Sequence, residues 1–186
     1  VLQVEAGVNF APDITNAEFV GKTFQDLSNP VSPASSGHAT GVGYKFYGLT
    51  SSITPAITDI AIYSVNSFLF DFLNFGTSAS PEALANRVAN HSWVGGHFVD
   101  SDNNEVLSST SNALRRIDWL ADEDEFIQVV APNNGTSGIK PLLTTGYNVI
   151  TVGRTDGSHL TSVSTIDNVY VADRSAIHLV VPESAT

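Results

Sequence analysis

The sequence has no cysteine among its 186 residues, which excludes disulfide bonds, a thiol nucleophile and a cysteine-ligated zinc site. It also lacks any run of about 18 apolar residues, so we expect no transmembrane helix. Basic residues are few: 8 lysines and arginines stand against 19 acidic residues, which gives a net charge of −11. Because such a chain repels phosphate groups and anionic lipids, we expect neither a nucleic-acid nor a membrane partner.

The length and the apolar content suit one compact domain. Hydrophobic residues make up 42% of the chain, which is sufficient for a substantial core. No linker or internal repeat divides the sequence, so we predict a single domain over residues 1–186. The chain begins at Val1 without a basic and apolar leader, which we interpret as processing. Few lysines and many serines, threonines and asparagines favour a secreted or extracytoplasmic protein.

Strand and helix patterns alternate along the chain. Short apolar runs predict strands, and periodic or capped segments predict helices between them. Residues 9–36 read as a loop with one short element near 17–24, and residues 59–73 begin as a strand and continue as strand or loop. The predicted strands are 1–5, 87–93, 126–131, 148–153, 169–172 and 177–181, and the predicted helices are 38–49, a short one from residue 80, and 108–121. Apolar strands separated by helices indicate an α/β fold, a three-layer sandwich with a mainly parallel central sheet.

Three candidate reactive groups fall where the strands of such a sheet end or helices begin. Glu5 ends the first strand, His38 starts a helix and Asn133 follows the strand 126–131. A carboxylate can orient an imidazole, the imidazole can accept a proton from a nucleophile, and an amide can stabilise an oxyanion. Each residue alone also has an ordinary structural explanation: a solvated strand end, a capping histidine and an Asn-Asn-Gly turn.

Five segments, in order, resemble motifs of the subtilisin-like serine peptidases. Residues 36–43 (S-G-H-A-T-G-V-G) are similar to the H-G-T-H-V-A-G motif of the histidine helix. Residues 1–8 resemble V-x-V-I-D-T-G-I, the strand with the triad aspartate, and residues 130–135 resemble A-A-G-N-x-G, which carries the oxyanion asparagine. Residues 87–95 resemble the cleft strand V-I-N-M-S-L-G, and residues 148–153 resemble V-I-A-V-G-A.

The resemblance implies a peptidase that binds a polypeptide as an extended strand along Ser92, Trp93, Val94 and Gly95. It also implies a Ser-His-Glu triad, because a glutamate occupies position 5 where the family has aspartate. His38 would then be the general base, Glu5 would orient it, and Asn133 would donate to the oxyanion. Pro132 replaces the glycine of the asparagine motif and leaves Asn134 as an alternative donor. We favour Asn133 because its distance from Ala131 matches the motif.

The triad serine is missing from the sequence. Residues 179–186 resemble the strand that approaches the serine, and Ala185-Thr186 matches the Gly-Thr before it. The sequence therefore breaks at a modified serine, or the protein is cut after Thr186 with the serine on a second chain, or the chain is a truncated or degenerate scaffold. We favour the first two explanations and expect this polypeptide alone to be inactive.

Other classes of function have weaker support. The remaining histidines show no H-x-x-x-H or H-E-x-x-H spacing, so we expect no metal site and no cofactor. The acidic stretches 100–105 and 122–125 leave calcium as an alternative, although neither has EF-hand spacing. An unrelated α/β hydrolase is disfavoured because G-x-S-x-G is absent. The main rival is a non-catalytic subtilase-like binding scaffold, favoured by Glu5 and by Pro132.

Overall fold

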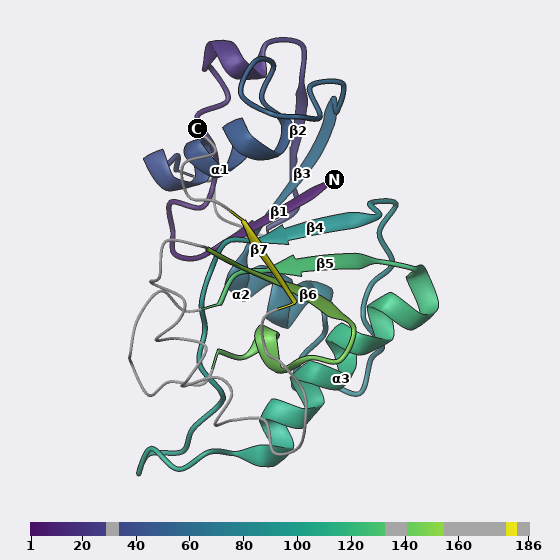
Figure 1. Ribbon diagram of the computed structural model, residues 1–186. Coiled ribbons are helices and arrows are strands. Elements are labelled where there is room, and N and C mark those ends of the chain that lie inside the picture. Colours follow the sequence, from purple (N-terminus) through teal and green to yellow (C-terminus); the bar gives the residue numbers. More distant parts are fainter. Residues whose placement is uncertain (29–33, 133–140, 155–177, 182–186) are drawn as a thin grey trace.

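The computed structural model describes residues 1–28, 34–132, 141–154 and 178–181 (Figure 1). Its centre is a seven-stranded sheet with the strand order β2-β3-β1-β4-β5-β6-β7. Every neighbouring pair is parallel, which confirms the predicted α/β class. The strands are β1 Leu2–Glu5, β2 Thr23–Asp26, β3 Asp59–Ser64, β4 Val88–His91, β5 Ile127–Val130, β6 Val149–Arg154 and β7 Leu179–Val181.

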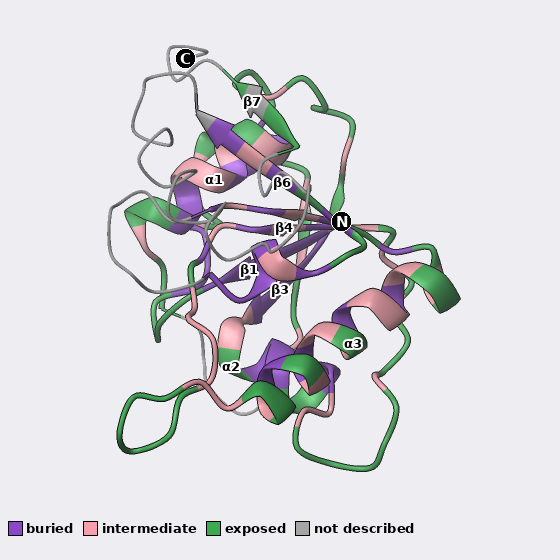
Figure 2. Ribbon diagram, turned by 60° about the horizontal axis from the view of Figure 1, so that its bottom comes forward, coloured by how far each residue is buried: buried purple, intermediate pink, exposed green. Residues whose placement is uncertain are grey.

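Helices cover both faces of the sheet. Figure 2 shows the buried strands between α1 on one side and α2 and α3 on the other, so the predicted three-layer sandwich is confirmed. None of the helices in the described part combines the length and apolar character that crossing a bilayer requires. The helices are α1 Gly37–Tyr47, α2 Val65–Ser67 and α3 Leu107–Asp124, with 3-10 turns η1 Ala17–Phe19 and η3 Leu143–Thr145 and a π turn η2 Phe68–Phe72.

The two faces of β1 have different roles because side chains alternate along a strand. Leu2 and Val4 pack into the larger apolar core, which also contains residues of α3. Gln3 and Glu5 point to the other face, where Gln3 contacts α1. The chemistry-bearing side of β1 is therefore the side covered by α1.

The strand order reverses at β1. Chain connections place β2 and β3 on one side of β1, and from β4 onward each strand is added on the other side. In open parallel sheets, such a switch point leaves a crevice at the carboxyl ends of the two neighbouring strands. Glu5 ends β1 and Ser92 follows β4, so both lie at this crevice.

Several predicted elements differ from the structure. The helix expected from residue 80 is absent, and residues 65–72, read as strand or loop, are helical in α2 and η2. Part of the loop 9–36 forms the edge strand β2, which pairs with β3. It contains polar residues such as Gln25 and lacks the apolar run that predicts a strand. Helix α3 continues through Asp124 and ends at Glu125, whose φ is 52°. The predicted strand 169–172 lies outside the described residues.

Candidate active site

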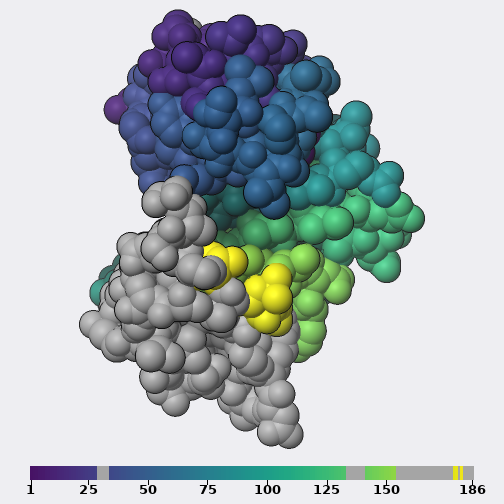
Figure 3. Space-filling model, turned by 45° about the horizontal axis from the view of Figure 1, so that its top comes forward, coloured from purple at the N-terminus to yellow at the C-terminus, as the bar shows by residue number. Residues whose placement is uncertain are grey.

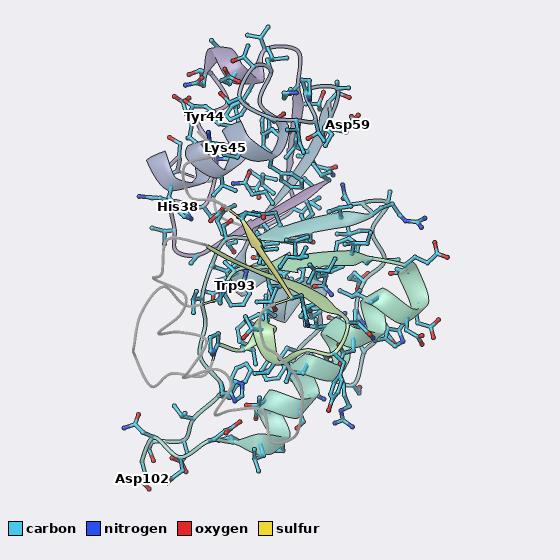
Figure 4. The ribbon with its side chains drawn as sticks, viewed as in Figure 1. His38, Tyr44, Lys45, Asp59, Trp93 and Asp102 are labelled. Carbon is cyan, nitrogen blue, oxygen red and sulfur yellow. The ribbon has the colours of Figure 1, made fainter. Side chains whose placement is uncertain are left out.

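The start of α1 is fixed by its N-cap. The Ser36 side chain accepts a hydrogen bond from the backbone N–H of Ala39 at 3.0 Å, and the Ser36 carbonyl accepts one from the Thr40 hydroxyl at 2.7 Å. This capping orders the first helical turn, which contains His38. Figure 4 shows His38 on the side of the sheet to which the arrows of β4 and β5 point.

Glu5 and His38 lie next to each other at this edge. Their Oε2 and Nε2 atoms are 3.3 Å apart, with the Glu5 side chain 2% exposed and the His38 side chain 67% exposed. The same His38 Nε2 lies 3.2 Å from the backbone carbonyl oxygen of Ser92. Three of the residues singled out from the sequence thus come together from β1, α1 and the segment after β4.

The imidazole of His38 presents its Nε2 atom to the carboxylate. An acid-base triad needs the carboxylate at one ring nitrogen and the nucleophile at the other. In this arrangement Nδ1 is the ring nitrogen that a nucleophile would approach. For Nε2 to face the nucleophile and Nδ1 to face Glu5, the His38 side chain would have to change its rotamer. The ring has room for that change because most of its surface is exposed.

Burial dominates the electrostatics of Glu5. Removal from water raises the pKa of its carboxyl group from 4.5 to about 7, against the opposing effects of a hydrogen bond from Gln3 and the attraction of His38. A carboxyl group with a pKa near neutrality can change its charge in the same pH range as an imidazole.

The predicted cleft residues, which follow β4, differ in how far they are exposed. Ser92 is half-buried beside His38, and Val94 is exposed. Trp93 is buried, and its indole N–H donates to His91 Nδ1 at 3.2 Å, so it packs beneath the segment. At Gly95 an added Cβ would lie 2.7 Å from the Trp93 ring, which explains the need for glycine.

A hollow of about 740 Å³ opens beside the pair, between α1 and the carboxyl side of the sheet. Its lining includes His38, Ser92 and Val181, the last residue of β7. Figure 3 looks onto this part of the surface, where the yellow atoms of β7 are visible. The volume lies in the range of ligand sites, about 300–1,000 Å³.

Asn133, the predicted oxyanion donor, lies outside the described residues, as does its alternative Asn134. The described chain reaches Pro132 on one side and resumes at Pro141 on the other. Ala131 donates its backbone N–H to the His91 carbonyl at 3.2 Å, which carries the β4–β5 pairing up to this point. Ala131, two residues before Asn133, therefore lies at the same sheet edge as Glu5.

Sequence reasoning missed two features of this region. The first is a pair of buried residues, of which Gln3 contacts Glu5 and Tyr47 contacts Gln3. The second is His97, which follows the predicted cleft residues 92–95. Its Nδ1 lies 2.5 Å from Glu105 Oε1 and its Nε2 lies 3.2 Å from the Thr145 hydroxyl, so His97 joins this part of the chain to η3. A glutamine inside a buried strand was the one available signal for the first feature; the second had none.

No family model matches the sequence, and no curated protein is significantly similar to it. Solved structures are similar in fold. They include the prenylagaramide maturation protease PagA (18% identity, TM-score 0.56), the nisin leader peptidase NisP from Lactococcus lactis (16%, 0.56) and a mutant of the protease domain of PatA (17%, 0.53). The chain therefore has a subtilisin-like protease fold.

The matches cover most of this chain but only part of the other proteins. The covered shares of this chain are 97% for PagA, 84% for NisP and 83% for PatA. The corresponding shares of those chains are 62%, 56% and 58%. The chain thus spans less than two thirds of the length of these neighbours.

Proposed function

We propose that this chain carries the acid-base pair of a subtilisin-type serine endopeptidase. The observation that supports it most is the contact of Glu5 with His38 at the switch point of a subtilisin-like sheet. The fold neighbours support the reaction class, since PagA is described as a maturation protease and NisP as a leader peptidase. A polypeptide is accordingly the proposed substrate.

In the proposed reaction, His38 accepts the proton of a serine hydroxyl as its oxygen attacks the scissile carbonyl carbon. Glu5 orients the imidazole and stabilises the positive charge that it gains. The tetrahedral intermediate then collapses, the C–N bond breaks, and His38 gives the proton to the leaving amine. Water, deprotonated by His38, hydrolyses the resulting acyl-enzyme and releases the serine.

Two further groups complete the proposal. Asn133 donates an amide hydrogen bond to the oxyanion of the tetrahedral intermediate, a contribution of about 3 kcal/mol in such sites. The substrate lies extended along Ser92–Gly95, where the Ser92 carbonyl already faces the His38 ring. A secreted or extracytoplasmic location forms part of the same proposal.

The proposed nucleophile is a serine that follows Thr186, on a continuation of this chain or on a second chain. Support comes from Val181 at the end of β7, which lines the same hollow as His38. The last described residue before Thr186 therefore lies at the hollow beside the acid-base pair. The serine would reach the imidazole from that side.

A fluorophosphonate probe, which modifies activated serines, tests this function on the natural full-length protein. We expect stoichiometric labelling of one serine C-terminal to Thr186, abolished in His38→Ala. Asp122→Ala, an exposed change on α3, is the control and should label as the wild type does. Absence of labelling in the wild type, or labelling that survives His38→Ala, would contradict the proposal.

A non-catalytic binding scaffold is the second candidate. The specific observation that favours it is the presentation of Nε2 rather than Nδ1 to Glu5. Such a scaffold would bind a peptide at Ser92–Gly95 and release it intact. Peptide binding by calorimetry together with a complete lack of probe labelling would support this candidate over the enzyme.

A further inference from the structure

A buried polar network lies behind Glu5, on the face of β1 that α1 covers. Gln3 and Tyr47 are both fully buried, which is unusual for a glutamine and a phenol in an apolar layer. Buried polar groups of this kind persist in structures when their hydrogen bonds are satisfied. The partners of both groups therefore show what the network does.

The hydrogen bonds of this network run in one direction. Tyr47 donates its hydroxyl proton to Gln3 Oε1 at 2.5 Å. Gln3 Nε2 donates to Glu5 Oε1 at 2.9 Å and to the backbone carbonyl of Ala39 at 2.9 Å. Because the amide uses both its donors and its acceptor, its orientation is fixed.

Glu5 has one more rotatable bond than an aspartate would have at the same position, so its carboxylate needs an additional restraint. The bond from Gln3 holds Oε1, and this leaves Oε2 directed at His38 Nε2, 3.3 Å away. The Ala39 carbonyl ties the same amide to the turn of α1 that carries His38. One amide thus contacts both the Glu5 carboxylate and the helical turn that carries His38.

We propose that Gln3 and Tyr47 are positioning residues that hold the Glu5 carboxylate against His38. This inference rests on the proposed function, since it concerns the same acid-base pair. Gln3 acts on Glu5 directly, and Tyr47 acts through Gln3. Neither residue touches the reacting atoms.

Gln3 also affects the ionisation of Glu5. The Gln3 hydrogen bond and the His38 ring lower the pKa of Glu5 against the larger effect of burial. Burial and the Glu5 charge raise the pKa of Tyr47, so the phenol keeps its proton and remains a donor at neutral pH. On the neighbouring strand β3 the residue in register with Glu5 is Ser64, which carries no charge.

The test follows the Glu5 carboxyl carbon by NMR during a pH titration of the natural full-length protein, with Glu5→Gln to assign its signal. Gln3→Met, which keeps the side-chain length, should raise the Glu5 pKa by about one unit. Tyr47→Phe, which removes one oxygen, should raise it by less. If Gln3→Met does not fold, Tyr47→Phe alone decides the outcome.

Matched controls exist on the other face of the sheet. Gln128 is a buried glutamine of β5 that donates to the Ile117 carbonyl, and Tyr63 is a buried tyrosine of β3. Gln128→Met and Tyr63→Phe should alter stability without moving the Glu5 titration. An unchanged Glu5 titration in Gln3→Met and Tyr47→Phe, or equal shifts in the controls, would overturn the inference.

Activity separates this inference from the proposed function. In the enzyme, Gln3→Met should shift the acidic limb of the pH profile of kcat/KM to higher pH by about one unit. At pH values on that limb, kcat/KM should therefore fall about tenfold. Full activity in Glu5→Gln would defeat the proposed function itself. Loss of activity in Glu5→Gln with an unchanged profile in Gln3→Met would defeat only the positioning role.

Discussion

At the scale of single residues, Glu5 combines burial with a charge-dependent role. Its pKa in the folded protein, about 7, lies above the ordinary value of 4.5, so the folded state prefers the protonated form. The resulting stability is complete below pH 4.5 and is lost as the pH rises through about 7. The ionised form that the proposed reaction needs is therefore the form that burial disfavours.

Glu5→Gln tests this conflict between stability and function. The glutamine does not titrate, so the variant should gain stability relative to the wild type between pH 4.5 and 7, by up to about 3 kcal/mol. Denaturant unfolding at pH 4.5 and pH 8 measures the difference. Glu123→Gln, an exposed change on α3, should give none. Parallel stability profiles for Glu5→Gln and the wild type would show that Glu5 is not strained by burial.

His91 behaves in the opposite way. Complete burial lowers its pKa from 6.5 to about 3, so the folded protein holds the ring neutral, where it accepts a hydrogen bond from Trp93. Its contribution to stability is present above pH 6.5 and is lost as the pH falls toward 3.

His91→Leu should therefore weaken the acid sensitivity of the fold. The wild type is expected to lose up to about 1.4 kcal/mol per pH unit from this residue between pH 6.5 and 3, and the variant should lack that slope. Its stability at pH 8 should be lower, because Trp93 loses its acceptor. Urea titrations across this range measure both effects, and an unchanged acid slope would refute the role of His91.

At the scale of elements, helix α1 depends on a close approach at one glycine. An added Cβ at Gly43 would lie 2.7 Å from the Tyr47 hydroxyl and 2.9 Å from the Phe19 ring, both buried. At Gly41, in the same helix, an added Cβ meets nothing within 4 Å. The two positions therefore separate packing from helix propensity.

The paired substitutions should have opposite signs. Gly41→Ala should stabilise the protein by up to about 1 kcal/mol through helix propensity. Gly43→Ala should destabilise it by about 1–3 kcal/mol, because Tyr47 is held by Gln3 and cannot move cheaply. Thermal unfolding of both variants measures this, and a stabilising Gly43→Ala would show that the contact is not tight.

The elements that the sequence predicted well are those whose local pattern and tertiary role agree. The strands β1, β4, β5 and β6 and the helices α1 and α3 have clear apolar patterns and lie within or close to their predicted ranges. The helix predicted to start at Ser80-Pro81 is absent because tertiary contacts hold this segment as a loop. Glu82 donates its backbone N–H to Phe72, and Arg116 binds the carbonyls of this loop.

Of the candidate site, the sequence could predict that Glu5 and His38 lie close together. Glu5 and His38 could be selected because strand ends and helix starts of a parallel sheet converge, and motif resemblance supported both. The pairing of Gln3 with Tyr47 could not be predicted, since the two residues are 44 positions apart and a glutamine in a buried strand does not show which partner it binds. Only packing of α1 on β1 reveals that network.

At the scale of the whole molecule, several apolar side chains on the α1 side of the sheet are exposed in the part of the chain that the structure describes. Val130 and Val149 point into the core beside α3. Ile127 and Ile150 lie at an odd spacing from them on the same strands, so they point to the α1 side. There Ile127 is 48%, Ile150 38% and Leu179 56% exposed. Exposed apolar side chains on three successive strands of one face can attract an apolar ligand.

A polypeptide of residues 1–186 should therefore bind a hydrophobic fluorescent dye. The emission should fall in a variant with Ile150→Thr and Leu179→Thr, because both lie on this face. The control is Val20→Thr, which changes an exposed residue next to η1 and should leave the emission unchanged. Equal emission from all three proteins would show that this face does not attract apolar ligands.

The most direct test of the central claim is the rate of peptide hydrolysis by the natural full-length protein and its Glu5 and His38 variants. With a fluorogenic peptide, kcat should fall by about 10⁴-fold in Glu5→Gln and by about 10⁶-fold in His38→Ala, with Asp122→Ala unchanged. Wild-type turnover in Glu5→Gln or in His38→Ala would contradict the claim that these two side chains form the acid-base pair of a peptidase.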